Sequence, residues 1–161
     1  MKVKHLIILI LLWIPVAIQA QERTDVLEKQ LEIIKTSPDN QEALLFVCEH
    51  YLKQGDYSKT VTYAEFLKNQ KSDRKNPSVL FNAHLYLGKA QMMSGREKAA
   101  RKNLDAALGL ATQLKNDSLL CTLYGALGEY AANIDADFYQ AIQWIYKGIE
   151  LAQRNRHKQQ Y

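Results

Sequence analysis

The sequence predicts an all-α protein, a right-handed solenoid of about three helix pairs preceded by an N-terminal cap helix. In residues 85–108, two stretches with apolar residues at helical spacing meet at Ser94-Gly95. A glycine can end a helix there because it takes the left-handed conformation without steric cost. The pattern returns about 40 residues to either side, and no alternating strand pattern interrupts it. A repeated helix pair that stacks on its copies is typical of a solenoid.

Equivalent residues in the copies define the period. Gly55 and Gly95 occupy the same point of successive copies, and Ala100 and Ala141 do so to within one position. We expect Gly88 to mark a close approach of two helices, because a residue without a side chain lets backbones come together. We take Gly125 as the counterpart of Gly88 in the third copy. On that basis, the third copy carries about four extra residues between its two helices, around residues 133–137.

Helix ends are also predicted from short polar signals. Asp39, Asp56 and Asp137 precede expected helix starts and can cap them, and Asn76 is followed by a proline at the first helical position.

The repeat resembles the tetratricopeptide repeat (TPR), whose pattern is W-x2-L-G-x2-Y, then A-x3-F, then P. The corresponding slots hold His84, Leu87, Gly88 and Gln91, then Ala100 and Leu104, with Thr112 at the proline position. The resemblance covers roughly residues 40–155. It implies a cap helix at 24–36 and repeats at about 40–72, 76–115 and 117–155. Their period is longer than that of the standard repeat.

Residues 1–20 predict a secretory signal peptide, so the folded domain is expected to span 21–161. A basic start precedes an unbroken apolar run from Leu6 to Ile14, and Ala20 offers a small residue at the cleavage position. A membrane anchor is the alternative, but Leu6 to Ile18 is well short of the ~20 residues that cross a bilayer. We therefore expect an exported protein, periplasmic or secreted, with no stable membrane span after cleavage.

Charge and cysteine content narrow the class further. Without Lys2 and Lys4, the 21 basic and 17 acidic side chains leave a net charge of +2, so no nucleic-acid partner is expected. Cys48 and Cys121 lie on helices separated by a whole repeat, beyond the ~7 Å that a disulfide allows between Cα atoms. Both are expected to be free, buried thiols.

No enzyme, cofactor or metal signature is present. Cys48 and His50 are two positions apart and point in different directions on a helix. His84 occupies the slot of a core tryptophan, and the acidic pair Asp135 and Asp137 lacks the glycine and distal glutamate of a calcium loop. The sequence therefore favours a non-enzymatic protein.

The TPR resemblance implies that the first helix of each pair lines a concave face that binds a protein or peptide. The positions carried over to this sequence are Glu42, Leu45, Glu49, Lys53, Asn82, Leu85, Lys89, Met92, Thr122 and Glu129. One TPR subclass holds a terminal carboxylate with basic and asparagine residues at such positions. Only Lys89 matches that pattern, so this activity is not carried over.

Two functions fit these features. The first is an exported protein-binding module that resembles the periplasmic input region of bacterial regulators and belongs to a larger sensor. The alternative is a stand-alone periplasmic scaffold or adaptor in envelope assembly or secretion. A reading frame that continues past Tyr161 into an apolar span favours the sensor.

The last helix has more apolar surface than one contact requires. One side, expected to pack on its repeat partner, carries Phe138, Ala141, Ile142, Ile145, Ile149 and Ala152, with Trp144 and Leu151 beside it. We expect a further repeat, an output domain or a second copy to cover this surface. The same reasoning predicts self-association that Trp144→Glu relieves.

Overall fold

The structure is a computed structural model that describes residues 25–70 and 76–158, and within these ranges the chain is helical without any strand. The all-α class is therefore confirmed. The predicted signal peptide lies outside the described residues. A helix over residues 25–36 is followed by α2 (Gln41–Gln54), α3 (Tyr57–Asn69), α4 (Pro77–Met93), α5 (Glu97–Gln113), α6 (Asp117–Asn133) and α7 (Phe138–Lys158).

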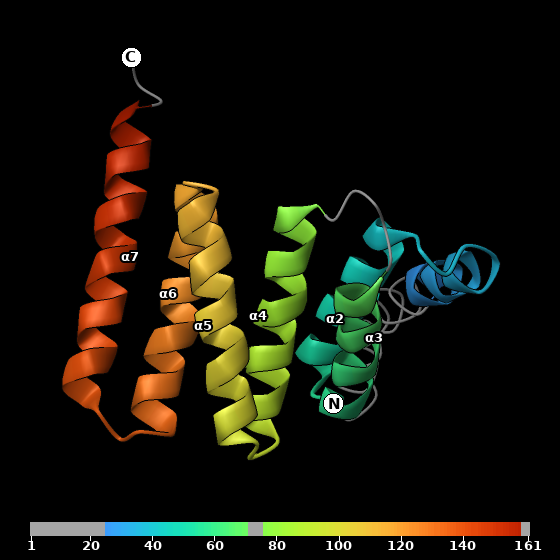
Figure 1. The fold of residues 1–161 in the computed structure, drawn as a ribbon, viewed down its shortest axis with the longest axis horizontal. Helices are drawn as coiled ribbons and strands as arrows, with labels where there is room; N and C mark the ends of the chain where they lie inside the picture. The colour runs from blue at the N-terminus through green and yellow to red at the C-terminus, as the bar shows by residue number, and fades with distance from the viewer. Residues whose placement is uncertain (1–24, 71–75, 159–161) are drawn as a thin grey trace, which may run out of the picture.

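The helices stand side by side in a row, from the helix over 25–36 at one end to α7 at the other (Figure 1). Each of α2 to α7 packs against its neighbours in the chain, and α4 also contacts both α2 and α6. The first helices of successive pairs therefore touch one another directly. The fold is repeat-like, as the regular spacing of the sequence pattern predicts.

Three of the four predicted helix caps are confirmed. Asp56 accepts a hydrogen bond from the Lys59 amide at 3.1 Å, and Asp137 accepts one from the Gln140 amide at 2.9 Å. Asn76 caps α4 ahead of a proline at the first helical position. The prediction for α2 is wrong by one position, because Asn40 and not Asp39 caps it. An asparagine oxygen serves this role as well as a carboxylate.

Two glycines end helices in the predicted way. Gly55 and Gly95 have φ values of 76° and 71°, the left-handed region that other residues rarely adopt. The turn after α2 is closed by the Asp56 amide, which donates to the Tyr51 carbonyl at 2.9 Å. Both turns are therefore set by local sequence.

The close helix approach at Gly88 is confirmed. A Cβ atom at this position would lie 2.7 Å from Leu104 Cδ2 and 3.4 Å from the Ala100 carbonyl oxygen. Leu104 is fully buried and fills the space that a side chain at Gly88 would need. The absence of that side chain therefore lets α4 and α5 pack closely.

The counterpart of Gly88 in the third copy is Gly128, and the prediction of Gly125 is wrong. A Cβ atom at Gly128 would lie 3.3 Å from Ile145 Cγ1 and 3.4 Å from the Ala141 carbonyl oxygen, whereas one at Gly125 would meet nothing within 4 Å. Gly128 also follows Gly88 by the same interval that separates Gly55 from Gly95. The connection between the helices of the third copy is accordingly longer than in the second by a single position, not by four.

A hydrogen-bonded polar network is built into the α4–α5 interface. Asn103 donates through Nδ2 to Gln91 Oε1 at 2.8 Å and to the Ala99 carbonyl at 3.0 Å. Its Oδ1 lies 2.8 Å from His84 Nδ1, which donates because the amide oxygen can only accept. Gln91 and Asn103 are buried and His84 is half-buried. His84 thus packs between helices with a hydrogen-bond partner, in keeping with its core position in the repeat.

The side of α7 that packs on α6 differs from the prediction. Ala141 and Leu151 are buried, and Trp144 stacks on Tyr124 with ring centroids 5.4 Å apart. Ile142 and Ile149, expected to face α6, are 50% and 46% exposed. Gly148 also faces α6, since a Cβ there would be in van der Waals contact with Tyr124 Cβ at 3.7 Å. The face with Ala141 and Gly148 therefore lets α7 approach α6 most closely. Trp144 is consequently unsuitable for testing self-association.

Candidate functional site

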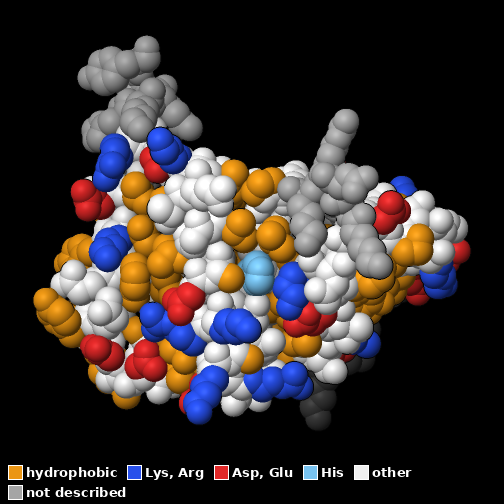
Figure 2. Space-filling view, in the orientation of Figure 1, with side chains coloured by type: hydrophobic (Ala, Val, Ile, Leu, Met, Phe, Trp, Pro, Cys, Tyr) orange, Lys and Arg blue, Asp and Glu red, His pale blue; other side chains and the backbone are white. Residues whose placement is uncertain are grey.

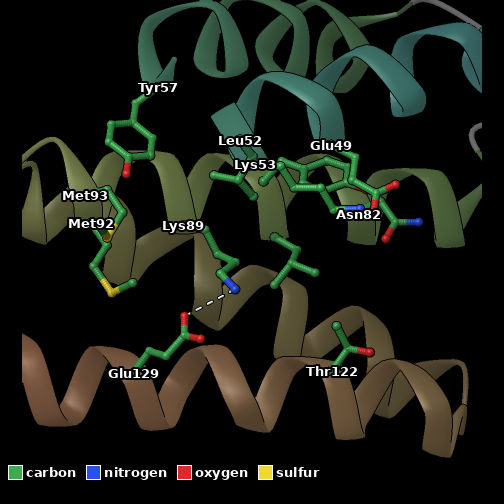
Figure 3. A pocket seen from close by; sticks show the side chains of 12 residues that line it. Glu49, Leu52, Lys53, Tyr57, Asn82, Lys89, Met92, Met93, Thr122 and Glu129 are labelled. Carbon is green, nitrogen blue, oxygen red and sulfur yellow. Dashed lines mark ion pairs between the residues drawn. The ribbon is translucent and has the colours of Figure 1, made fainter. Parts of the chain in front are cut away.

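A groove of about 450 Å³ lies over α4, with walls from α2, α3 and α6 (Figure 3). It forms because α4 contacts both α2 and α6 while lying between them in the row. Its lining residues are Glu49, Leu52, Lys53, Tyr57, Asn82, Leu85, Tyr86, Lys89, Met92, Met93, Thr122 and Glu129. We refer to this hollow as the α4 groove.

Eight of the ten predicted positions line the α4 groove, and the two exceptions lie early in α2. Glu42 is exposed in the first turn of that helix. Leu45 is half-buried and packs against the cluster that contains Leu44 and Leu67. Ile34 of the preceding helix packs against the same cluster, so Leu45 belongs to the core and not to the groove.

Two of the groove residues also belong to the core. Leu85 and Met92 are each only 5% exposed and belong to the cluster shared by α4, α5 and α6. Shortening either to alanine would remove buried surface, which costs ~2–5 kcal/mol. An alanine variant of Met92 therefore cannot report on binding alone.

Four lining residues were missed by sequence reasoning: Leu52, Tyr57, Tyr86 and Met93. Leu52 lies one period before Met92, so strict use of the period would have found it. Tyr57 begins α3, and only the Gly55 turn brings it over the groove. Tyr86 and Met93 flank predicted positions, and no periodic signal marks them.

Both lysines of the groove are paired with carboxylates. Lys53 pairs with Glu49 one turn earlier on α2. Lys89 reaches across to α6, where its Nζ lies 3.2 Å from Glu129 Oε2, as the dashed line in Figure 3 marks. These are partly exposed pairs that stabilise the fold by at most ~1 kcal/mol each. They leave the groove with two positive and two negative charges that compensate one another.

The two ends of the groove differ in polarity. Tyr57, Met92 and Met93 gather at one end in Figure 3, whereas Glu49 and Asn82 lie at the other. Met93 is 55% exposed, so its side chain is accessible to a ligand. Methionine adapts to irregular surfaces because its side chain is unbranched and polarizable. One end of the groove is therefore an accessible apolar surface.

The other polar side chains of the groove either hydrogen-bond to their own helix or are uncharged. Asn82 donates to the Ser78 carbonyl and Thr122 to the Ser118 carbonyl, each at 3.1 Å on its own helix. Burial, together with the negative charge of Glu49, raises the pKa of Tyr86 above its ordinary value, so its hydroxyl stays protonated. Within the described part of the chain, no group of three or more His, Cys, Asp or Glu residues could hold a metal ion.

Both cysteines are free, as predicted, but the prediction that both are buried is wrong for Cys121. Cys48 is fully buried between helices, whereas Cys121 is half-buried and its Sγ donates to the Gly148 carbonyl at 3.4 Å. Burial raises the pKa of the Cys48 thiol to about 12. The thiolate is the reactive form, so Cys48 is held unreactive at neutral pH.

Thiol labelling tests this difference. With iodoacetamide at pH 8, we expect Cys121 to be modified in the folded protein and Cys48 only after unfolding, as mass spectrometry of the peptides would show. Equal labelling rates for the two native thiols would contradict the burial of Cys48.

The stability contributed by the Cys48 thiol depends on pH. Because the folded pKa of Cys48 exceeds the unfolded value, this contribution is complete below pH 9 and is lost as pH rises from 9 towards 12. Cys48→Ala should therefore lose less stability than the parent above pH 9.

Comparisons with known proteins add no identification: no family model matches the chain, and neither a curated protein nor a solved structure matches it. Among the helices of the described residues, none has the length and apolar character needed to cross a membrane. The function is therefore inferred from the α4 groove itself.

Proposed function

We propose that this protein is an exported, non-enzymatic module that binds a segment of another protein in the α4 groove. The groove itself carries the proposal, because a hollow of about 450 Å³ lined by three repeated helices has the size of a ligand site. Its apolar end supplies contact area, and the compensated charges beside it supply polar contacts at the rim. Protein-binding surfaces commonly combine these two features.

The proposal includes a TPR-type arrangement, in which the helix pairs continue as a right-handed superhelix and α2, α4 and α6 form its concave side. Two observations support it. Gly88 and Gly128 lie one period apart, and each receives a side chain from the second helix of its pair. The direct contacts of α4 with α2 and α6 fit an inner layer of first helices.

The charges of the groove favour an uncharged, apolar ligand segment. A ligand carboxylate would have to displace Glu49 from Lys53 or Glu129 from Lys89, and a ligand cation would have to displace a lysine. Either exchange replaces one ion pair by another and gains little. A large apolar side chain would instead cover Tyr57 and Met93 without breaking an interaction. We therefore expect affinity to come from apolar side chains.

The cellular setting belongs to the proposal as well. The signal-peptide pattern in residues 1–20 supports a periplasmic or secreted location. In that setting the module is either the input part of a larger regulator or a stand-alone scaffold in envelope assembly or secretion. The coding sequence beyond Tyr161 discriminates between the two.

Peptide selection followed by a matched pair of variants tests the binding site. Peptides selected from a randomised phage library on residues 21–161 would be labelled and titrated by fluorescence anisotropy. Met93→Glu should weaken binding at least ~10-fold, because it places an uncompensated charge at the apolar end of the groove. Its control is Phe66→Glu on α3, an equally accessible apolar residue outside the groove at 47% exposure.

The expected outcome is a selective loss in Met93→Glu with melting temperatures close to the parent in both variants. Equal affinities for Met93→Glu and the parent would move the binding site away from the α4 groove. A stronger loss in Phe66→Glu would place it on the side formed by the second helices. Failure to select any binding peptide would count against a peptide-binding function.

A further inference from the structure

The apolar end of the α4 groove contains two methionines in different environments. The chain has three methionines, and Met1 belongs to the predicted signal peptide, so residues 21–161 contain only Met92 and Met93. Both line the groove, and Figure 3 shows them at the same end as Tyr57. Met92 is 5% exposed, whereas Met93 is 55% exposed. A small reagent in solution therefore reaches the Met93 side chain far more readily than that of Met92.

Its sulfur atom distinguishes Met93 from the other accessible apolar side chains. Hydrophobic side chains are exposed elsewhere too, and Figure 2 shows them gathered along the edge of the molecule where Figure 1 places α7. Among the nine exposed large hydrophobic residues of the described chain, however, only Met93 contains sulfur. A thioether is oxidised to a polar sulfoxide, a reaction that hydrocarbon side chains do not undergo. Met93 is therefore an accessible apolar residue that can be made polar chemically.

The oxidation transfers one oxygen atom and two electrons. Hydrogen peroxide gives an oxygen atom to the Met93 sulfur, so that an S–O bond forms and the O–O bond breaks. The proton on the transferred oxygen passes to the other oxygen, which leaves as water. The sulfur loses two electrons and the peroxide gains them. Two-electron reduction by methionine sulfoxide reductases, one enzyme for each sulfoxide epimer, restores the thioether and releases the oxygen as water.

The fold does not depend on the Met93 side chain. Met93 is the last residue of α4, and the Ser94 hydroxyl closes this helix end by donating to the Ala90 carbonyl at 2.7 Å. Met92, by contrast, belongs to the core cluster that α4 shares with α5 and α6. Oxidation of Met93 therefore leaves the helices in place, whereas oxidation of Met92 would put a polar group into the core.

We propose that Met93 is a reversible oxidation site that regulates ligand binding in the α4 groove, an inference that rests on the proposed function. In the reduced protein, the Met93 thioether covers an apolar side chain of the ligand. In the oxidised protein, the same contact would remove the polar sulfoxide from water without giving it a hydrogen-bond partner. Oxidation therefore weakens binding. The proposed export places the protein outside the cytosol, in an oxidising setting where such a site responds to peroxide.

Peptide mass spectrometry tests the selectivity of the oxidation. Residues 21–161 would be treated briefly with hydrogen peroxide, and fragment ions would assign the added oxygen to Met92 or Met93. In proportion to the exposed fractions, Met93 should be oxidised on the order of tenfold faster than Met92 in the folded protein, and both at similar rates after unfolding. The melting temperature should stay close to that of the parent when Met93 alone is oxidised. Equal rates in the folded protein would overturn the proposal.

Fluorescence anisotropy with a peptide selected from the phage library tests the regulation. Catalase removes the peroxide before the peptide is added, so that only the protein is oxidised. The affinity of the parent should fall at least ~5-fold on oxidation and return after treatment with both reductases and dithiothreitol. Met93→Leu should show no change on peroxide treatment, whatever its own starting affinity, whereas Met92→Leu should respond as the parent does. Cys121 is present in both variants, so an effect of thiol oxidation would appear in Met93→Leu.

Failure of the regulation can be told apart from failure of the binding function. A peptide that binds the untreated protein and keeps its affinity after Met93 is oxidised would overturn the regulation, while the binding function stands. An equal fall in affinity in Met93→Leu would assign the effect to another residue and also overturn the regulation. Absence of any peptide that binds the untreated protein would overturn both.

Discussion

Gly88→Ala is expected to lower the free energy of unfolding by ~1–3 kcal/mol, and Gly88→Leu by more. Alanine normally stabilises a helix by ~1 kcal/mol relative to glycine. At this position the added Cβ would lie 2.7 Å from Leu104 Cδ2, closer than carbon atoms can approach. Leu104 is fully buried, so it cannot move aside without disturbing its own neighbours. The clash should therefore outweigh the gain in helix propensity.

Two other glycines provide matched controls. Gly128→Ala should cost less than Gly88→Ala, because its nearest side-chain atom would be 3.3 Å away and belongs to the half-exposed Ile145. Gly125→Ala should stabilise the protein, since its Cβ would meet nothing within 4 Å in the middle of α6. Urea unfolding followed by circular dichroism measures all three. A stability of Gly88→Ala equal to that of the parent would show that α4 and α5 are not closely packed.

Asn103→Ala is expected to cost ~2–3 kcal/mol, because it leaves buried polar groups without partners. The amide of Asn103 joins Gln91 and His84, both in hydrogen bonds of 2.8 Å. Alanine removes both contacts and takes away the donor that Gln91 Oε1 has in the parent. The control Asn69→Ala removes only a long surface contact of 3.4 Å to Glu65, so its effect should stay within ~0.5 kcal/mol.

A double-mutant cycle separates the network from ordinary packing. The double variant leaves fewer unpaired polar groups than the two single variants taken together. The loss of unfolding free energy in the double variant should therefore be smaller than the sum of the losses in Gln91→Ala and Asn103→Ala, by at least ~0.5 kcal/mol. The same denaturation measurement applies. Additive effects would mean that the two amides act independently.

Local signals explain how much of this fold could be predicted. Gly55 and Gly95 end helices because their own backbone conformation does so, and Asp56 and Asp137 cap helices through atoms in the first helical turn. Gly88 was predictable because it follows a large apolar residue in a repeated pattern. Each of these features depends on sequence neighbours or on the period alone.

The errors arose where the sequence leaves open which face of a helix is packed. Gly125 and Gly128 lie on the same helix, and only the position of α7 decides which one is contacted. Leu127-Gly128 repeats Leu87-Gly88 in the next copy, so a strict period would have selected the correct glycine. On α7, apolar residues surround much of the helix. The packed side depends on where Ala141 and Gly148 admit the backbone of α6, which is a tertiary property.

The residues that line the groove were predicted better than the contacts among them. The period places Glu49, Lys89 and Glu129 at equivalent points of successive first helices, and all three line the groove. Sequence reasoning missed the Lys89–Glu129 contact because it joins helices that are not adjacent in the chain. It also missed Tyr57 and Met93, whose placement depends on the Gly55 turn and on the end of α4. The apolar end of the groove is therefore a product of tertiary packing.

Photo-cross-linking from inside the groove tests the central claim most directly. Benzoylphenylalanine would replace Lys53 in the groove or, as the control, Lys102, which is exposed on α5 outside it. On irradiation with a labelled peptide selected for binding to residues 21–161, we predict an adduct from position 53 and none from position 102. An adduct from position 102 of equal or greater yield would contradict binding in the α4 groove.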